Sequence, residues 1–251
     1  MGILDILYPA RCPVCHEIIR GRGKVCAPCK KKLRYIKEPK CKKCGKEIEK
    51  PEQEYCRDCQ RFAHSFEKGA SVFAYDPVMR RSISMFKYHN RREYAKFYAE
   101  EMYRHCGYFI KFVKPDVIIP VPVHRLKKRQ RGFNQAELVA KELGKLTNVP
   151  VVTNYLIRSE KTTPQKELTR QQRKANLKKA FAVTGTGVSY ERVLLIDDIY
   201  TTGSTVDAVA EVLLGGGAHR TGKSGGCWKE LECFAKKHYP DAREVCRWAT
   251  Q

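Results

Sequence analysis

Residues 192–205 read RVLLIDDIYTTGST: an apolar run, two adjacent aspartates, and a short stretch of small and hydroxyl side chains. An uninterrupted apolar run of this length is typical of a strand buried on both faces. The stretch that follows predicts a turn into a helix, where free backbone N–H groups, Thr and Ser hydroxyls and the helix dipole all favour an anion. The segment therefore predicts an α/β fold in which a phosphate binds where a buried strand gives way to a helix.

The two aspartates narrow the class of ligand. Asp197 and Asp198 are adjacent carboxylates at the end of a buried strand, where they repel each other and resist desolvation, so a purely structural turn has no need of both. They suit the hydroxyls of a ribose or a Mg²⁺ ion, which prefers carboxylate and phosphate oxygens. The phosphate itself is expected on five consecutive residues: Thr201, Thr202, Gly203, Ser204 and Thr205. Together these groups describe a ribose 5-phosphate.

Two common phosphate motifs do not fit this segment. It matches neither the dinucleotide fingerprint GxGxxG nor the P-loop pattern GxxxxGK[ST]. The order of residues resembles instead the 5-phosphoribosyl-1-pyrophosphate (PRPP) motif of type I phosphoribosyltransferases. The alternative interpretation is an ordinary strand, turn and capped helix, with the aspartates as turn residues.

The N-terminal region carries a cysteine pattern typical of metal sites. Four CxxC pairs occupy it: Cys12/Cys15, Cys26/Cys29, Cys41/Cys44 and Cys56/Cys59. Each CxxC turn places two thiolates on one side of a metal, and a second turn completes a tetrahedron, so the spacing predicts two structural Zn²⁺ sites. Pairing in sequence order is the simpler assignment, and a cross-braced arrangement is also open. Redox-active dithiols are the alternative, although these usually occur singly beside a βαβ pattern.

The charge of the chain indicates the kind of partner. Its 251 residues include 49 Lys and Arg against 27 Asp and Glu, a formal net charge of +22. Such an excess favours a polyanionic partner, most often nucleic acid, over a basic protein with no such partner. Three aromatic residues among the N-terminal cysteines could either stack on the bases of a single strand or fill a small core: Tyr35, Tyr55 and Phe62.

The rest of the chain alternates strand and helix patterns. A strand is predicted over 72–77, a helix over 92–113, and a buried strand over 116–123 that is followed by a basic segment and another helix. This alternation predicts a doubly wound parallel sheet that binds its ligand at the carboxyl ends of the strands. We divide the chain into a double zinc ribbon (1–62), an α/β domain (63–218) and a divergent C-terminal tail (219–251). In the tail, 228–238 and 241–249 are predicted to be helical.

The whole pattern resembles the ComF family of competence proteins from Pro9 to about Ala218. The motifs that carry the resemblance occur in one order: the CxxC pairs, KY (87–88), PVPVH (120–124), RGFNQ (131–135), TPQ (163–165), the run Arg173, Asn176, Ala180 and Phe181, and the Asp-Asp turn. The resemblance implies a phosphoribosyltransferase-like domain and a cytoplasmic role in DNA uptake, on single-stranded DNA and with a helicase-like partner. The N-terminal residues MGILDILYPA fit this location, because they lack the charged start and long apolar stretch of a secretory signal. No stretch has the length of a membrane span.

The same resemblance supplies further site residues. A loop that corresponds to the pyrophosphate loop comprises Val121, Pro122, Val123, His124 and Arg125. Arg129 and Arg131 could neutralise pyrophosphate, whereas Asn134 and Gln135 are expected to cap the next helix. Three functions therefore stay open: a DNA-uptake component with a PRPP-like ligand and Mg²⁺, a true phosphoribosyltransferase, and a zinc-ribbon scaffold for a motor protein.

Overall fold

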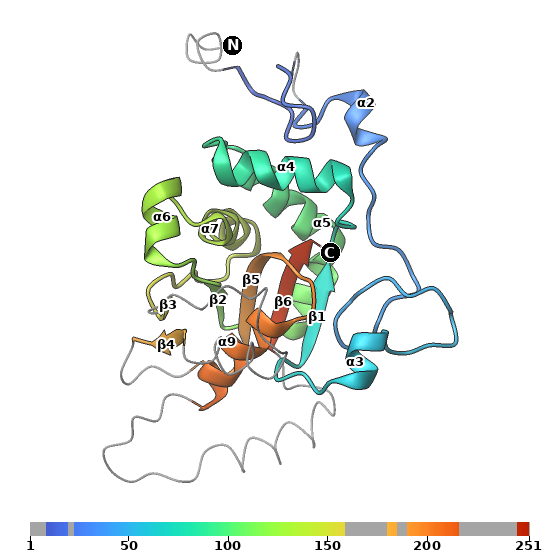
Figure 1. Cartoon of the computed structure of the whole chain (residues 1–251), viewed down its shortest axis with the longest axis vertical. Coiled ribbons are helices and arrows are strands. Elements are labelled where there is room, and N and C mark those ends of the chain that lie inside the picture. The colour runs from blue at the N-terminus through green and yellow to red at the C-terminus, as the bar shows by residue number, and fades with distance from the viewer. Residues whose placement is uncertain (1–8, 20–22, 159–179, 185–189, 216–244, 251) are drawn as a thin grey trace, which may run out of the picture.

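The computed structural model describes residues 9–19, 23–158, 180–184, 190–215 and 245–250 (Figure 1). Its centre is a sheet of four parallel strands in the order β1-β6-β5-β2. The strands are β1 (Lys68–Ser71), β2 (Val117–Pro120), β5 (Val193–Ile199) and β6 (Val245–Thr250). A parallel bridge from Ile118 to Val151 continues the pairing beyond β2. The parallel α/β sheet expected from the sequence is confirmed.

Helices cover both faces of this sheet. Three of them share one core: α4 (Pro77–Tyr88), α5 (Tyr94–Val113) and α7 (Gln135–Thr147). The second core contains α9 (Ser204–Gly215) and a small antiparallel pair, β3 (Leu156–Arg158) and β4 (Phe181–Val183). Three short helices complete the described elements: α2 (Ala27–Lys30), α3 (Arg57–Arg61) and α6 (Arg125–Arg131).

The alternation of side chains along β5 creates the two cores. Leu194 and Ile196 pack with α4, α5 and α7, whereas Val193 and Leu195 pack with α9. Successive side chains of a strand point to opposite faces, so an all-apolar strand is buried on both sides. The two cysteine clusters divide in the same way: Cys12 and Cys29 belong to the first core, and Cys41, Cys44 and Cys56 to the second.

Helix boundaries follow from local capping. Asp76 accepts a hydrogen bond from the Met79 backbone N–H at 2.8 Å, with Pro77 at the first helical position of α4. The strand predicted over 72–77 is therefore wrong in position: β1 ends at Ser71, and only Phe73 makes a further bridge, to Tyr35.

Of the described helices, none is long and apolar enough to cross a bilayer.

The C-terminal prediction needs correction. Helix was expected over 241–249, but 245–250 form β6, which pairs in parallel with β1 on one side and β5 on the other. A strand with neighbours on both edges satisfies its backbone through the sheet, so it needs no alternating apolar pattern, and the pairing overrides local helical preference. The other predicted helix, 228–238, lies outside the described residues.

Candidate functional site

Two clusters of four cysteines are assembled in the N-terminal region. One holds Cys12, Cys15, Cys26 and Cys29, and the other holds Cys41, Cys44, Cys56 and Cys59; within each cluster the sulfur atoms lie within 4.8 Å of one another. Pairing in sequence order is therefore confirmed.

The spacing of the sulfur atoms suits zinc. Zn–S bonds of about 2.3 Å in a tetrahedron place neighbouring sulfurs about 3.8 Å apart. The Cys15 and Cys26 sulfurs are 3.7 Å apart, and those of Cys44 and Cys56 are 3.6 Å apart. Burial raises the pKa of the Cys12 thiol, but hydrogen bonds from surrounding backbone N–H groups outweigh it and lower the pKa to about 7. Four sulfur ligands leave no coordination position for a substrate, so both sites are structural in type.

The first ribbon, which contains the cluster Cys12, Cys15, Cys26 and Cys29, packs against the start of α5. The ring of His16 lies 2.9 Å from the Tyr94 hydroxyl through Nδ1, and that hydroxyl donates to the Cys12 carbonyl at 3.2 Å. His16 is half-buried in a left-handed turn (φ 70°). Tyr35 donates to Glu101 at 2.7 Å and stacks on His105, so it fills a core. Tyr55 is exposed.

The second ribbon, which contains the cluster Cys41, Cys44, Cys56 and Cys59, packs against β1 and the end of β5. The left-handed Gly45 lies so close to β1 that a Cβ there would come within 2.5 Å of the Gly69 carbonyl oxygen, and Gly69 N–H donates to the Lys43 carbonyl at 2.8 Å. The Lys46 ammonium lies 5.5 Å from the ring centre of Tyr200, the residue after β5. The second four-cysteine cluster therefore belongs to the same packed unit as the predicted phosphate turn.

The two aspartates lie near the end of the strand β5, as predicted, and are half-buried. The Asp198 backbone N–H donates to Asp197 Oδ1 at 2.8 Å. Lys87 Nζ, near the end of α4, lies 2.5 Å from Asp198 Oδ2, with both side chains mostly buried. Burial lowers the pKa of Arg158, and attraction between its charge and the Asp197 carboxylate opposes that shift.

The turn after β5 has the backbone shape of an anion cradle. Gly203 has φ +82°, and a Cβ on it would lie 2.7 Å from Tyr200 Oη and 3.0 Å from His64 Cε1. The Thr202 and Ser204 hydroxyls are 2.8 Å apart, and α9 begins at Ser204. Thr201 and Thr202 are exposed, and Ser204 and Thr205 are half-buried. The five predicted residues are therefore brought together at the N-terminus of α9.

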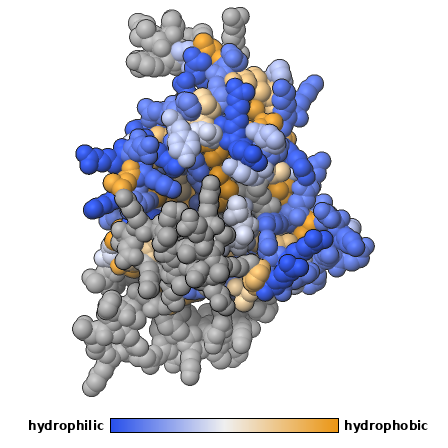
Figure 2. All heavy atoms as spheres, in the orientation of Figure 1, coloured by the Kyte–Doolittle hydropathy of each residue, from blue (hydrophilic) through white to orange (hydrophobic). Residues whose placement is uncertain are grey.

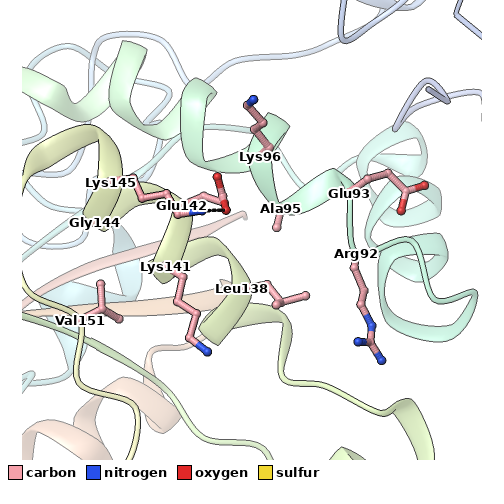
Figure 3. A pocket seen from close by; sticks show the side chains of 10 residues that line it. All are labelled: Arg92, Glu93, Ala95, Lys96, Leu138, Lys141, Glu142, Gly144, Lys145 and Val151. Atoms are coloured by element: carbon pink, nitrogen blue, oxygen red, sulfur yellow. Dashed lines mark hydrogen bonds and ion pairs between the residues drawn. The ribbon is translucent and has the colours of Figure 1, made fainter. Parts of the chain in front are cut away.

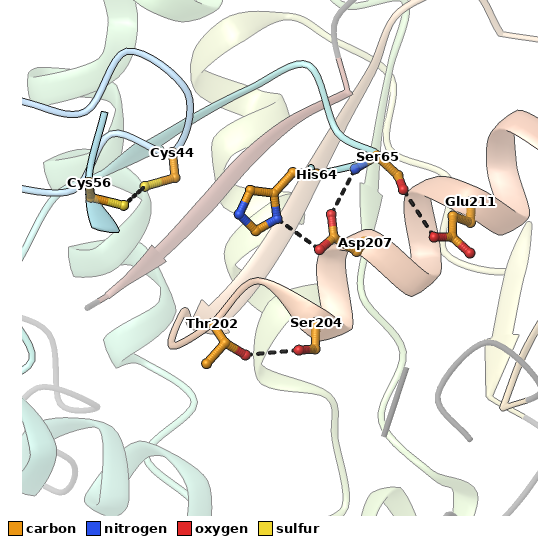
Figure 4. A network of polar contacts seen from close by, with 8 residues as sticks. All are labelled: Cys44, Cys56, His64, Ser65, Thr202, Ser204, Asp207 and Glu211. Atoms are coloured by element: carbon orange, nitrogen blue, oxygen red, sulfur yellow. Dashed lines mark hydrogen bonds and ion pairs between the residues drawn. The ribbon is translucent and has the colours of Figure 1, made fainter. Parts of the chain in front are cut away.

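A polar network holds this turn against the segment that follows the second ribbon (Figure 4). His64 Nδ1 lies 2.8 Å from Asp207 Oδ2, with the His64 side chain fully buried. The Ser65 backbone N–H donates to Asp207 Oδ1 at 2.9 Å, and its hydroxyl donates to Glu211 at 3.1 Å. The network ties α9 to residues 64–65 through side chains of its first two turns.

The predicted pyrophosphate loop follows β2, at the same end of the sheet. Val121 is buried, Pro122, Val123 and His124 are half-buried, and Arg125 and Arg129 are exposed on α6. Asn134 donates to the Val121 carbonyl at 3.0 Å and accepts from the Ala136 N–H, so its predicted capping role is confirmed and extends to the loop. Arg131 is half-buried: its guanidinium lies 4.7 Å from the ring centre of Tyr88.

Comparison with known proteins identifies the family to which the chain belongs. A family model described as a double zinc ribbon domain matches residues 3–60. Competence protein F of Haemophilus influenzae is 30% identical over 209 residues, which cover 81% of this chain and 90% of the relative. The chain belongs to the ComF family. Competence protein ComFC of Bacillus subtilis is 29% identical over 208 residues (78% of this chain, 80% of the relative). DNA utilization protein YhgH of Escherichia coli K12 is 28% identical over 217 residues (85% and 94%).

Some contacts in this ComF-family chain were not predicted. Lys87 and Tyr88 form the KY motif, for which the sequence predicts no role, and His64 and Asp207 belong to no motif that the sequence shows. Each pair joins segments far apart in the chain: Lys87 to Asp198, and His64 to Asp207. The pattern of a single sequence shows local periodicity and not contacts between distant segments. The only available signals for these contacts were the lysine of the KY motif and the histidine that follows the last cysteine pair.

A concave region lies between α5 and α7 (Figure 3), with a volume of about 850 Å³. Its floor includes Ala95, Leu138 and Val151, and its walls carry four cations and two carboxylates: Arg92, Lys96, Lys141, Lys145, Glu93 and Glu142. Lys145 pairs with Glu142 at 2.6 Å. This groove of the ComF-family chain is therefore cationic with a small apolar floor.

Proposed function

We propose that this ComF-family protein binds single-stranded DNA during DNA uptake and holds a PRPP-like ribose 5-phosphate with Mg²⁺ beside that DNA. The observation that carries the proposal is a shared location. Lys87 of α4 pairs with Asp198 of the acid pair, and the next residue, Tyr88, contacts Arg131 of the basic helix α6. The ribose-phosphate residues and the cationic surface therefore adjoin each other.

The ribose-phosphate part rests on the donor groups after β5. The left-handed Gly203 and the start of α9 offer backbone N–H groups to a phosphate, and no Cβ fits at Gly203 to block its approach. Asp197 and Asp198 supply the hard oxygen ligands that Mg²⁺ prefers or accept the ribose hydroxyls. The parallel sheet with its ligand groups at the carboxyl ends of strands agrees with a type I phosphoribosyltransferase-like domain.

The DNA part rests on charge and on the relatives. Arg125, Lys127, Lys128 and Arg129 are exposed on α6, and hydrophilic side chains dominate the visible surface over α4 and α6 (Figure 2). Exposed cations in this density attract a phosphate backbone. The relatives are named for competence and DNA utilization. By the same reasoning we propose a cytoplasmic location and a helicase-like partner for this chain.

Two titrations test the proposal. Fluorescence anisotropy with a labelled oligo(dT) should give an affinity whose log–log dependence on salt has a slope of about −0.7 per phosphate contacted. A flat salt dependence contradicts the DNA part. Calorimetry with Mg²⁺ and PRPP should show binding that the double variant Asp197→Asn/Asp198→Asn abolishes while its circular dichroism stays unchanged. Equal affinity in that variant contradicts the ribose-phosphate part.

One alternative function has a specific observation in its favour. The complete set of Asp197, Asp198 and the turn 201–205 would also serve a true phosphoribosyltransferase, whose protein contribution would be to position PRPP and stabilise departing pyrophosphate. Release of pyrophosphate from PRPP in the presence of a nucleobase, and its loss in the double variant, would favour this function. The scaffold hypothesis instead requires partner binding that survives the double variant.

A further inference from the structure

We infer that Tyr88, held by Arg131, is a base-stacking platform for single-stranded DNA at the edge of the ribose-phosphate site; this inference rests on the proposed function. Tyr88 ends α4 and Arg131 ends α6. Tyr88 is 62% exposed, so one face of its ring is open to a base.

The contacts of Arg131 hold the tyrosine in place. Its guanidinium lies 4.7 Å from the ring centre, and its Nη2 donates to the Tyr88 hydroxyl at 3.0 Å. Its Nη1 donates to Gln135, which is buried at the start of α7, at 3.2 Å. A ring that is exposed and also fixed loses little conformational freedom when a base stacks on it. The pair therefore has the pre-organisation that a stacking platform needs.

The surroundings select a nucleic acid over a protein. Lys87 precedes Tyr88, and the exposed cations of α6 lie on the helix that ends at Arg131. A second arginine, Arg92, lies 5.0 Å from the ring centre of Phe133, two residues beyond Arg131. Aromatic and arginine planes among backbone-binding cations are the combination by which single strands are held without sequence preference.

The chain offers a matched control for this tyrosine. Tyr108 of α5 is 86% exposed and lies beside the shallow hollow formed by Glu100, Tyr103, Arg104 and Lys111. Within the described part of the chain, Tyr108 makes no cation–π contact. Both tyrosines are exposed, so replacing either should leave the fold intact, which circular dichroism and zinc content check.

The experiment measures oligo(dT) affinity by fluorescence anisotropy across a salt series. Tyr88→Ala should weaken binding at least about fivefold, as expected for the loss of one stacked base, without changing the salt slope, because no charge is removed. Tyr88→Phe and Tyr108→Ala should stay within about twofold of wild type. Arg129→Ala, by contrast, should reduce the magnitude of the slope by about 0.7.

A second ligand separates base stacking from contacts with the phosphate backbone. An abasic oligonucleotide of equal length keeps its phosphates but has no bases, so Tyr88→Ala should bind it as wild type does. The inference is overturned if wild type binds oligo(dT) but Tyr88→Ala matches it, or if the variant loses the same factor on the abasic strand. If wild type itself shows no salt-dependent binding, the proposed DNA function fails instead.

Discussion

Replacing Gly203 with alanine should destabilise the protein, whereas the same change at Gly107 should stabilise it. Gly203 has φ +82°, where a side chain costs about 1–3 kcal/mol. Its Cβ would also lie 2.7 Å from the Tyr200 hydroxyl oxygen and 2.9 Å from Cε2 of the same ring, and Tyr200 is only 3% exposed, so it has little room to move. Overpacking of this kind adds about 1–3 kcal/mol. We expect Gly203→Ala to lower the free energy of unfolding by at least about 2 kcal/mol.

Gly107 provides the opposite case. It lies within α5, where the nearest atoms to an added Cβ belong to Tyr103 at 3.7 Å and 3.8 Å, an ordinary contact distance. Alanine is favoured over glycine inside a helix by about 0.5–1 kcal/mol.

Thermal unfolding followed by circular dichroism measures both changes. In a chain of this size 1 kcal/mol corresponds to about 2–4 °C, so Gly203→Ala should unfold at least about 4 °C below wild type and Gly107→Ala about 1–4 °C above it. A midpoint for Gly203→Ala within about 1 °C of wild type would refute the reasoning, because the turn would then tolerate a side chain.

Three further predictions concern zinc content, Mg²⁺ affinity and the pH dependence of stability. Cys56→Ser should reduce bound zinc from two ions to one per chain, measured by elemental analysis. It should also weaken PRPP binding, because the Cys56 cluster packs in the same core as Tyr200. Cys26→Ser should lose one zinc ion but keep its PRPP affinity, because its cluster packs against the other core. Lys87→Met should raise Mg²⁺ affinity in the absence of ligand about fivefold by calorimetry, because it removes the cation 2.5 Å from Asp198; unchanged affinity would place the metal elsewhere. Burial lowers the pKa of His105 below its ordinary value, so the fold loses stability as the pH falls below about 6.5; His105→Gln should narrow the difference in unfolding midpoint between about pH 7.5 and pH 5.5.

Local patterns predicted the parts of the site that are local in the chain. The run 192–205 forms β5, the turn and the start of α9, because burial of an apolar strand and capping of a helix depend on adjacent residues. The CxxC spacing identified both sulfur clusters, because geometry within a metal site is set by short segments.

Contacts between distant segments of the chain could not be predicted from the sequence. Asp198 gave no sign that Lys87 would lie beside it, and RGFNQ gave no sign that its arginine would stack on Tyr88. The last strand was missed for a related reason: VCRWAT has no alternation, and its place between β1 and β5 is decided by the two strands that flank it.

The position of β6 between β1 and β5 has a consequence for how the chain folds as it is made. Lys68 pairs with Cys246, about 180 positions later, and a ribosome adds roughly 5–20 residues per second, so β1 waits roughly ten to forty seconds for its neighbour. The zinc ribbons can load their metal during that delay, but the sheet that carries the phosphate turn cannot close. A nascent chain of this protein therefore carries an open sheet edge until β6 has been synthesised, and it is in that interval that chaperones would be needed most.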